Sequence, residues 1–317
     1  MTAQGQGNDA PIIRIDGLIK RFADMKAVDR LSLSVYRGEI FGLVGPDGAG
    51  KTATMRMLAG VMRPDAGVII VDGIDAVADP EGVKPYVSYM PQRFALYEDL
   101  TVDENIRFYA DLFEVAPAVR RERAARLLTA SGMSAFGRFK AGQLSGGMKQ
   151  KLGLACALVH TPKILLLDEP TTGVDPVSRR DFWRILYGLR DEGVTIVIST
   201  AYLDEAERCN RLTLLHAGHA LYCDTPAALK QRMPGALVAI STTEGRDVRD
   251  AIGGLPGISN ALLVGDGVHA VVDDANRRIP ELRHALDRAA ISFSGIAVAT
   301  PSIEDVFVTL LEAGGAF

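Results

Sequence analysis

A glycine-rich octapeptide at residues 45–52 constrains the fold more than any other part of this sequence. It consists of Gly45, Pro46, Asp47, Gly48, Ala49, Gly50, Lys51 and Thr52. A short apolar run precedes it, Ile40–Val44, and the helical pattern Lys51–Ala59 follows. Glycines let successive backbone N–H groups approach an anion, and the positive end of a helix favours the same anion. The octapeptide therefore predicts a phosphate-binding loop in which Lys51 reaches the β- and γ-phosphates and Thr52 ligates Mg²⁺. We expect Asp47 to turn away from the phosphates.

Two carboxylates follow a second apolar run. Ile164–Leu167 leads directly into Asp168 and Glu169, and ligands of open α/β sheets bind at such strand ends. Successive side chains of a strand point in opposite directions, so the two residues can serve different roles. We expect Asp168 to belong to the Mg²⁺ shell and Glu169 to activate a water molecule against the γ-phosphate.

Composition and charge exclude several classes of protein. The 317 residues carry a formal charge of −4, whereas a protein that coats nucleic acid needs a strong positive field. No segment approaches the roughly 18 consecutive apolar residues of a membrane-spanning helix. Three widely spaced cysteines offer neither a disulfide framework nor metal-ligand spacing. Residues 1–11 are polar, and we expect them to be flexible and to lack a secretory signal.

Hydrophobic patterning predicts an α/β domain over residues 12–225. The runs Ile40–Val44, Ile164–Leu167 and Val194–Ser199 lack alternation, as in strands that are covered on both faces. Residues 12–35 alternate and predict an antiparallel flank, while residues 93–142 predict a helical subdomain. Four arginines of that subdomain (Arg120, Arg121, Arg123 and Arg126) are interpreted as a solvated helix face rather than as a nucleic-acid or lipid patch.

Residues 226–317 predict a separate small α+β domain. Strand patterns occupy Ala236–Ser241 and Gly295–Val298, and a hairpin joins Ala261–Val264 to Val268–Val272. Helical patterns cover Arg246–Ile252, a segment with Pro280 near its first turn, and a last segment that Ser302 and Asp305 open as a capping box. The order β-α-β-β-α-β is that of a ferredoxin-like sandwich, which we interpret as a regulatory or dimerising extension.

A second helix start has the features of an anion site. Its residues are Leu144, Ser145, Gly146, Gly147 and Gln150. A serine N-cap, free N–H groups and the helix dipole together attract an anion. One nucleotide cannot easily occupy both the phosphate loop and this helix start on a single chain. We therefore expect two such nucleotide-binding domains to pair head to tail.

Together with the phosphate loop and LLLDEP, the sequence LSGGMKQ resembles the nucleotide-binding subunit of ATP-binding cassette (ABC) transporters. The resemblance covers about residues 12–225 and implies a P-loop NTPase fold with ATP and Mg²⁺ as cofactors. It implies that Phe22 stacks on adenine, that Gln92 contacts Mg²⁺ and takes part in catalysis with Lys51 and Glu169, and that Asp175 lies in a loop at the dimer interface. Residues 226–317 are similar to the extension of drug-exporter ATPases that serve ABC-2 type permeases. Among these, the first cassette of tandem multidrug efflux ATPases is most similar.

One position departs from the family. Where the family has a histidine that holds the γ-phosphate, the sequence Ser199-Thr200-Ala201-Tyr202 has Ala201. None of the five histidines (His160, His216, His219, His269 and His284) is placed to replace it, and we expect ATP to bind while turnover at this site is slow.

The resemblance implies the ATP-hydrolysing subunit of an exporter. Its expected partners are a second cassette, identical or different, and an integral membrane permease on whose inner, cytoplasmic face the chain sits. No nucleic acid is expected. The alternative is a regulatory half that binds ATP without hydrolysing it. A third class, cassette proteins of DNA repair or translation, is disfavoured because it needs a long coiled coil or a second cassette.

Overall fold

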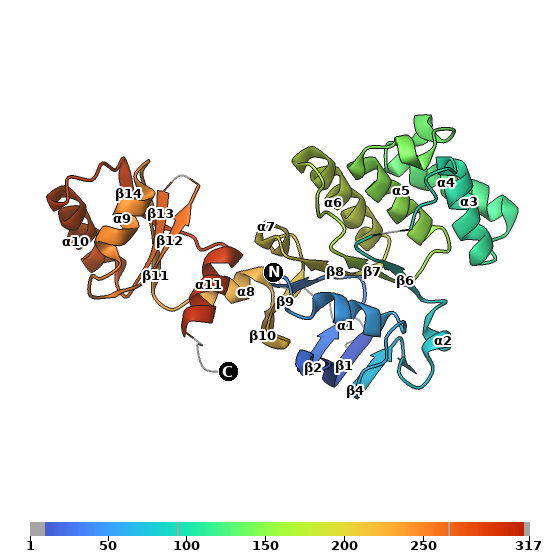
Figure 1. Ribbon diagram of the computed structural model, residues 1–317, viewed down its shortest axis with the longest axis horizontal. Coiled ribbons are helices and arrows are strands. Elements are labelled where there is room, and N and C mark those ends of the chain that lie inside the picture. The colour runs from blue at the N-terminus through green and yellow to red at the C-terminus, as the bar shows by residue number, and fades with distance from the viewer. Residues whose placement is uncertain (1–9, 94, 266, 314–317) are drawn as a thin grey trace, which may run out of the picture. The chain divides into compact units, whose positions relative to one another are not determined.

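The computed structural model describes residues 10–93, 95–265 and 267–313 (Figure 1). Two compact units divide the chain, residues 1–223 and 224–317, so the predicted boundary after residue 225 differs by two residues. The expectation of a flexible N-terminus covers residues 1–11, of which residues 1–9 lie outside the described residues. Within the described ranges, no helix combines the length and apolar character that crossing a membrane requires.

A six-stranded sheet forms the centre of the first unit, with strand order β10-β9-β3-β8-β7-β6. The strands are β3 (Ile40–Val44), β6 (Val87–Met90), β7 (Ile164–Asp168), β8 (Thr195–Thr200), β9 (Arg211–His216) and β10 (His219–Asp224). Pairing is parallel from β9 through β6, and the three predicted core strands are confirmed. β3, β7 and β8 are buried along their whole length, which explains why their sequences do not alternate.

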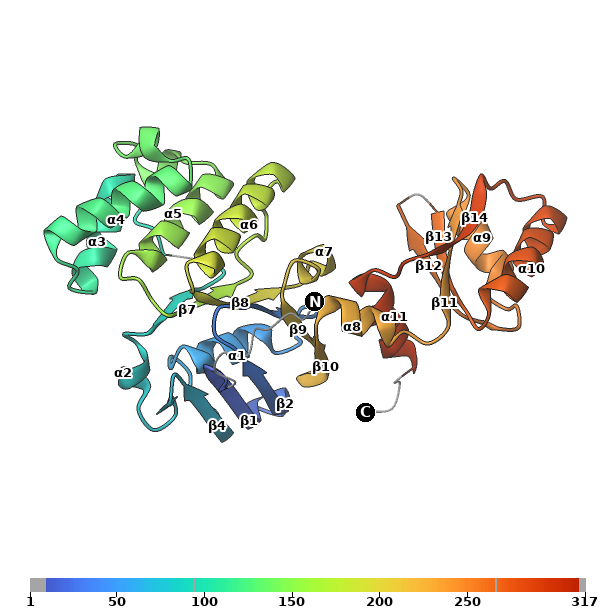
Figure 2. The same cartoon turned by 180° about the vertical axis from the view of Figure 1, so that it is seen from behind.

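Helices connect these strands, as a parallel sheet requires. They are α1 (Lys51–Leu58), α5 (Gly146–Leu158), α6 (Pro176–Asp191) and the short α7 (Leu203–Ala206). Figures 1 and 2 both show α5 and α6 beside β7 and β8, whereas α1 lies next to the flanking strands. Phe182, Leu186 and Leu189, spaced four and three residues apart, are buried on α6.

The antiparallel flank is a second sheet of order β2-β1-β4-β5. Its strands are β1 (Ile13–Phe22), β2 (Met25–Val35), β4 (Ala66–Val71) and β5 (Ile74–Asp75). Alternate residues of β1 and β2 are buried, among them Ile13, Ile15 and Leu31, and they join one hydrophobic core with Met55 and Leu58 of α1. This core holds the flank against the helix that follows the phosphate loop.

Helical elements fill the expected subdomain. They are α3 (Val102–Leu112), α4 (Pro117–Ala130) and two 3₁₀ turns, Ser134–Phe136 and Ala141–Gln143, after the short α2 (Pro80–Val83). Thr101 begins α3 with a complete capping box to Glu104. The four arginines do not share one face of α4: Arg120 and Arg121 line one hollow, whereas Arg123 and Arg126 line another.

The second unit has the predicted ferredoxin-like topology. Its elements are α8 (Pro226–Gln231), β11 (Ala236–Ser241), α9 (Gly245–Ile252), β12 (Ile258–Val264), β13 (Gly267–Val272), α10 (Ala275–Arg288), β14 (Gly295–Ala299) and α11 (Ile303–Ala313). The strands pair antiparallel in the order β12-β13-β11-β14. One face packs against α9 and α10, and the other packs against Val306 of α11. The predicted capping box is present: the Asp305 N–H donates to Ser302 Oγ, and the Ser302 N–H donates to Asp305 Oδ2.

The start of α10 corrects one expectation. The helix begins at Ala275, so Pro280 lies inside it rather than in its first turn. Asp274 caps the helix by accepting from the N–H groups of Asn276 and Arg277, and this cap places the true start ahead of the proline.

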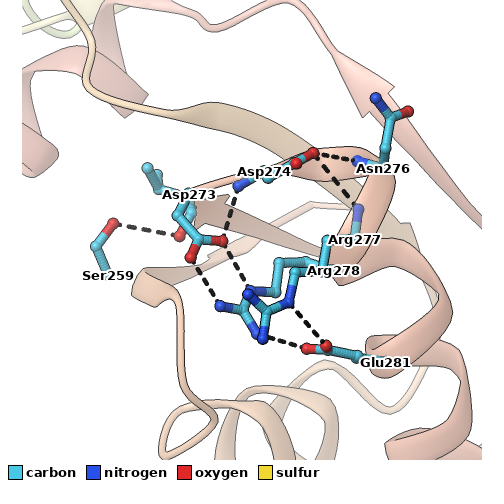
Figure 3. Close-up of polar contacts among 8 residues, drawn as sticks. Ser259, Asp273, Asp274, Asn276, Arg277, Arg278 and Glu281 are labelled. Carbon is cyan, nitrogen blue, oxygen red and sulfur yellow. Dashed lines mark hydrogen bonds and ion pairs between the residues drawn. The ribbon is translucent and has the colours of Figure 1, made fainter.

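A buried arginine anchors α10 (Figure 3). Arg278 donates to both carboxylate oxygens of Asp273 at 2.7 Å and to Glu281 at 2.6 Å. The bidentate pair holds the pKa of Asp273 well below its usual range. Gly257 lies against this guanidinium with φ +79°, and a Cβ there would stand 2.2 Å from Arg278 Nε. The left-handed backbone and this close approach therefore favour glycine at position 257.

Candidate nucleotide-binding site

The phosphate loop joins the end of β3 to the start of α1. Gly48 and Gly50 have φ of +80° and +98°, in the left-handed region that favours glycine. A Cβ on Gly50 would stand 2.3 Å from the carbonyl oxygen of Ala27 on β2, and a Cβ on Gly218 would stand 3.1 Å from the same oxygen. The phosphate loop thus packs closely against β2 of the antiparallel flank.

Lys51 begins α1 and is almost fully buried, with 4% exposure. Its ammonium group donates to the carbonyl oxygens of Gly45 (2.8 Å) and Pro46 (2.9 Å) and lies 3.0 Å from Glu169 Oε1. A buried ammonium requires such partners, because desolvation without them is costly. The loop therefore holds a positive charge at its concave side, where the predicted phosphates would bind.

Hard oxygen donors meet at the end of β7. Asp168 is 1% exposed. Its Oδ1 accepts from Thr52 Oγ1 at 3.1 Å and from Ser199 Oγ at 2.6 Å. Carboxylate and hydroxyl oxygens are the ligands that Mg²⁺ prefers, so the contact between Thr52 and Asp168 suits this ion, and their role as its ligands stays a prediction.

Glu169 adopts a left-handed backbone, with φ +48°. Its N–H donates to the carbonyl oxygen (3.1 Å) and hydroxyl group (3.0 Å) of Ser199. This conformation is uncommon for a residue other than glycine and is often found at functional sites. Gln92 Nε2 donates to Glu169 Oε2 at 3.1 Å, so the structure brings these two predicted residues into direct contact.

Two residues that contact Asp168 were not identified from the sequence, namely Ser199 on β8 and Tyr89 on β6. The Tyr89 hydroxyl donates to Asp168 Oδ2 at 3.2 Å. Burial and the neighbouring Asp168 raise the pKa of Tyr89 to about 12, so the phenol keeps its proton and remains a donor. These strands flank β7 on both sides, and only knowledge of the strand order would have identified the two hydroxyl groups.

A hollow of about 360 Å³ brings together many of the predicted residues, although Gly45, Pro46, Ala49 and Asp168 are not part of its lining. It is lined by Phe22, Asp47, Gly48, Gly50, Lys51, Thr52, Gln92 and Glu169. Phe22 ends β1 and is 45% exposed, with Lys20 Nζ 5.6 Å from the ring centroid. Asp47 is exposed, but it also lines the hollow, so its expected position away from the phosphates stays a prediction. A hollow lined by both an exposed aromatic ring and a lysine suits a flat base joined to phosphates.

The remaining predicted residues do not line this hollow. Ser145 is the exposed N-cap of α5 and accepts from the Met148 N–H. Leu144 and Gly147 are buried, whereas Gly146 is exposed and Gln150 is half-buried. Asp175 caps α6 by accepting from the Ser178 N–H at 2.9 Å, and its bonds to Ser178 lower its pKa.

Ala201 lies just past the end of β8 and is exposed. The neighbouring Tyr202 stacks against Arg179, whose guanidinium carbon is 4.4 Å from the ring centroid. Among the residues that the structure describes, no histidine lines the hollow. His160, for example, stacks on Phe113 with 3.8 Å between ring centroids.

Known proteins share both the sequence and the fold. The sequence profile of the ABC transporter family matches residues 28–172. The daunorubicin resistance ATP-binding protein DrrA2 of Streptomyces coeruleorubidus is 32% identical over 307 residues, which cover 95% of each chain. The chain belongs to the ABC transporter family. Among its drug-resistance relatives is the probable multidrug ABC transporter ATP-binding protein YbhF of Escherichia coli, 45% identical over 97% of this chain.

This ABC chain spans about half of its E. coli relative, 53% of that protein's length. The dimeric structure of MJ0796, a bacterial ABC transporter cassette, matches 67% of this chain and 98% of its own with a TM-score of 0.62 and 26% identity. The predicted P-loop α/β fold is therefore confirmed, and the resemblance to drug-exporter ATPases is borne out by the relatives.

Proposed function

We propose that this chain is the ATP-binding and ATP-hydrolysing subunit of an ABC exporter. Members of this family couple ATP hydrolysis to transport, and the hollow that unites Phe22, Lys51, Gln92 and Glu169 carries the proposal for this chain. The relatives named for multidrug or daunorubicin resistance favour a drug-like cargo. We propose that the permease, rather than this chain, recognises that cargo.

Each residue of the site has a proposed part in holding MgATP. Phe22 stacks on adenine, and the loop from Gly45 to Thr52 surrounds the phosphates, with Lys51 against the β- and γ-phosphates. Thr52, Asp168 and Gln92 hold Mg²⁺, which neutralises phosphate charge when bound. Glu169 orients and deprotonates the attacking water molecule.

The lysine gives the first test. Lys51→Ala should weaken MgATP binding at least tenfold, because a buried cation that faces the phosphates is lost. Isothermal titration calorimetry measures the affinity. Lys84→Ala serves as the control, since Lys84 lies on the surface, where it pairs with the exposed Glu81. Unchanged affinity in Lys51→Ala would sink the proposal.

A head-to-tail pair of cassettes completes the proposed cycle. Ser145, with Leu144, Gly146, Gly147 and Gln150, would clasp the nucleotide of a partner cassette, and Asp175 would lie at the shared interface. Support comes from the exposed helix end at Ser145 and from the dimer formed by the MJ0796 cassette. The partner is an identical chain or a second cassette of different sequence.

Ala201 gives the cycle an asymmetry. Because no imidazole contacts the γ-phosphate, we propose that ATP is hydrolysed slowly at this chain's own site. The Ser145 motif would meanwhile complete the nucleotide site of a partner cassette that has the histidine. Ala201→His should then raise turnover by on the order of 10²-fold. Tyr202→His, which puts the same ring one position further on, should not. Equal ATPase rates in the unchanged chain and Ala201→His would refute slow turnover.

The alternative function is a regulatory half that binds ATP without hydrolysing it, which Ala201 favours. Glu169→Gln separates the two functions in the assembled transporter. Transport that continues nearly unimpaired would support the regulatory role, whereas arrested transport would support hydrolysis at this site.

We further propose that an ABC-2 type permease anchors the chain to the cytoplasmic face of the membrane. The helical subdomain, about residues 93–142, and the Gln92 segment would transmit cassette closure to it. Residues 226–317 would act as a regulatory or dimerising extension. A pull-down from detergent-solubilised membranes tests the anchoring, and recovery of nucleic acid in place of a permease would contradict it.

A further inference from the structure

A second hollow lies at the opposite end of the parallel strands from the nucleotide site. It has a volume of about 370 Å³, and its lining includes Lys163, just before β7, and Val194 and Thr195 at the start of β8. α4 and the last turns of α5 and α6 form its other side. Both views show α4 beside α5, and α5 and α6 beside β7 and β8 (Figures 1 and 2). None of its lining residues belongs to the nucleotide hollow.

Four cations from three separate segments converge on this hollow. They are Arg37, Arg123, Arg126 and Lys163. Glu192 is the carboxylate of the described lining, and it lies 3.3 Å from Arg126. Arg37 and Lys163 share one further carboxylate, Asp72. Four positive charges therefore face two negative ones, in a chain whose net charge is −4.

Of the four cations, Arg123 is the one best able to donate N–H groups to a ligand. Its side chain is half-buried, and it donates Nη1 to the Val159 carbonyl oxygen at 3.1 Å. Among the residues that the structure describes, it has no carboxylate within ion-pair distance. A guanidinium can donate five N–H groups in a planar fork that matches a carboxylate.

The rest of the wall is mainly apolar, with Thr161 and Thr195 as its other polar side chains. Ile12, Leu127, Leu158 and Leu189 line it, and its described residues include no aromatic side chain on which a base could stack. A pocket of this size with an apolar wall and a few convergent polar groups is typical of small-molecule sites. We propose that it binds a small aliphatic carboxylate, with the acid group on Arg123 and Lys163 and the alkyl chain against the leucines.

α4 supplies a matched control for this site. Arg121 lies on the same helix but lines the hollow on its other side. Arg121→Gln therefore removes the same charge from the same helix without changing the proposed site. Arg123→Gln and Lys163→Gln remove the two cations that the carboxylate would contact.

Calorimetric titration of the full chain, saturated with MgATP, with octanoate tests the proposal. Octan-1-ol, which has the same alkyl chain without the charge, is the matched ligand. We expect octanoate to bind more tightly than octanol and the Arg123→Gln/Lys163→Gln variant to bind it at least tenfold more weakly. Arg121→Gln should bind octanoate as the unchanged chain does, and every variant should retain its MgATP affinity.

Three outcomes would overturn the proposal. They are equal affinities for octanoate and octanol, undiminished octanoate binding in the double variant, and an equal loss in Arg121→Gln, which would indicate general charge attraction. The comparison of the two ligands uses the unchanged chain and so stands even if the double variant fails to fold.

Discussion

Ser199 joins the two acidic residues of the nucleotide site through one hydroxyl group. It donates to Asp168 Oδ1 and accepts from the Glu169 N–H. Ser199→Ala should lower the free energy of unfolding by about 1–3 kcal/mol, because it removes a buried hydrogen bond to the charged Asp168 carboxylate. It should also weaken MgATP binding. Denaturant unfolding measures the stability, and calorimetry measures the MgATP affinity. The control is Ser88→Ala, at a buried serine of β6 on the other side of β7, which should leave the MgATP affinity unchanged.

His160 is the residue whose environment predicts a pH effect. Burial, with a smaller contribution from Arg123, lowers its pKa from 6.5 to about 4. The unfolded chain therefore binds a proton at higher pH than the folded chain does, and stability from this residue falls as the pH drops from about 6.5 to 4. An NMR titration should show a midpoint near 4 for the histidine signal that disappears in His160→Gln. A midpoint near 6.5 would contradict the prediction.

The residues that the sequence identified in the site are those with contiguous motifs. Lys51, Thr52, Asp168 and Glu169 follow directly from a loop or a strand end, and each lies at the expected place. Tyr89 and Ser199 could not be found this way, because their contact with Asp168 depends on which strands neighbour β7 in the sheet. The resemblance supplied Phe22 and Gln92, which no local pattern marks as ligands.

At the scale of the element, the contact between Gly257 and α10 carries the next prediction. Gly257→Ala places a Cβ against Arg278 and requires a left-handed backbone, so it should destabilise the second unit by about 1–3 kcal/mol. Gly254→Ala is the control, because a Cβ there meets nothing within 4 Å. Thermal unfolding followed by circular dichroism measures the difference. Equal melting temperatures would show that the arginine moves aside at little cost.

Elements with strong local signals were predicted well. The buried strands β3, β7 and β8 and the hairpin β12–β13 occur within a few residues of their expected bounds. The start of α10 was wrong because the Asp274 cap acts ahead of Pro280, and a proline inside a helix is an uncommon exception. The short helix α8 was not expected, although Thr225 caps it by accepting from the Ala228 N–H.

For the whole molecule, the division into two units predicts a separable nucleotide site. Every residue that lines the nucleotide hollow belongs to residues 1–223. A chain shortened to these residues should bind MgATP within about threefold of the full chain, since a folded domain retains its own core. Calorimetry compares the two chains, with Lys51→Ala in the shortened chain as the negative control. A folded fragment without affinity would assign part of the site to the second unit.

The close approach of Gly50 to the Ala27 carbonyl oxygen bears on which ligand lengths the proposed nucleotide site can accept. Ala27 backs the phosphate loop from β2, and Phe22 ends β1, the other strand of the same hairpin. One hairpin thus links the aromatic ring to the phosphate loop. If the proposed function holds, compounds with a shorter or longer span between ring and anion should bind more weakly than ATP.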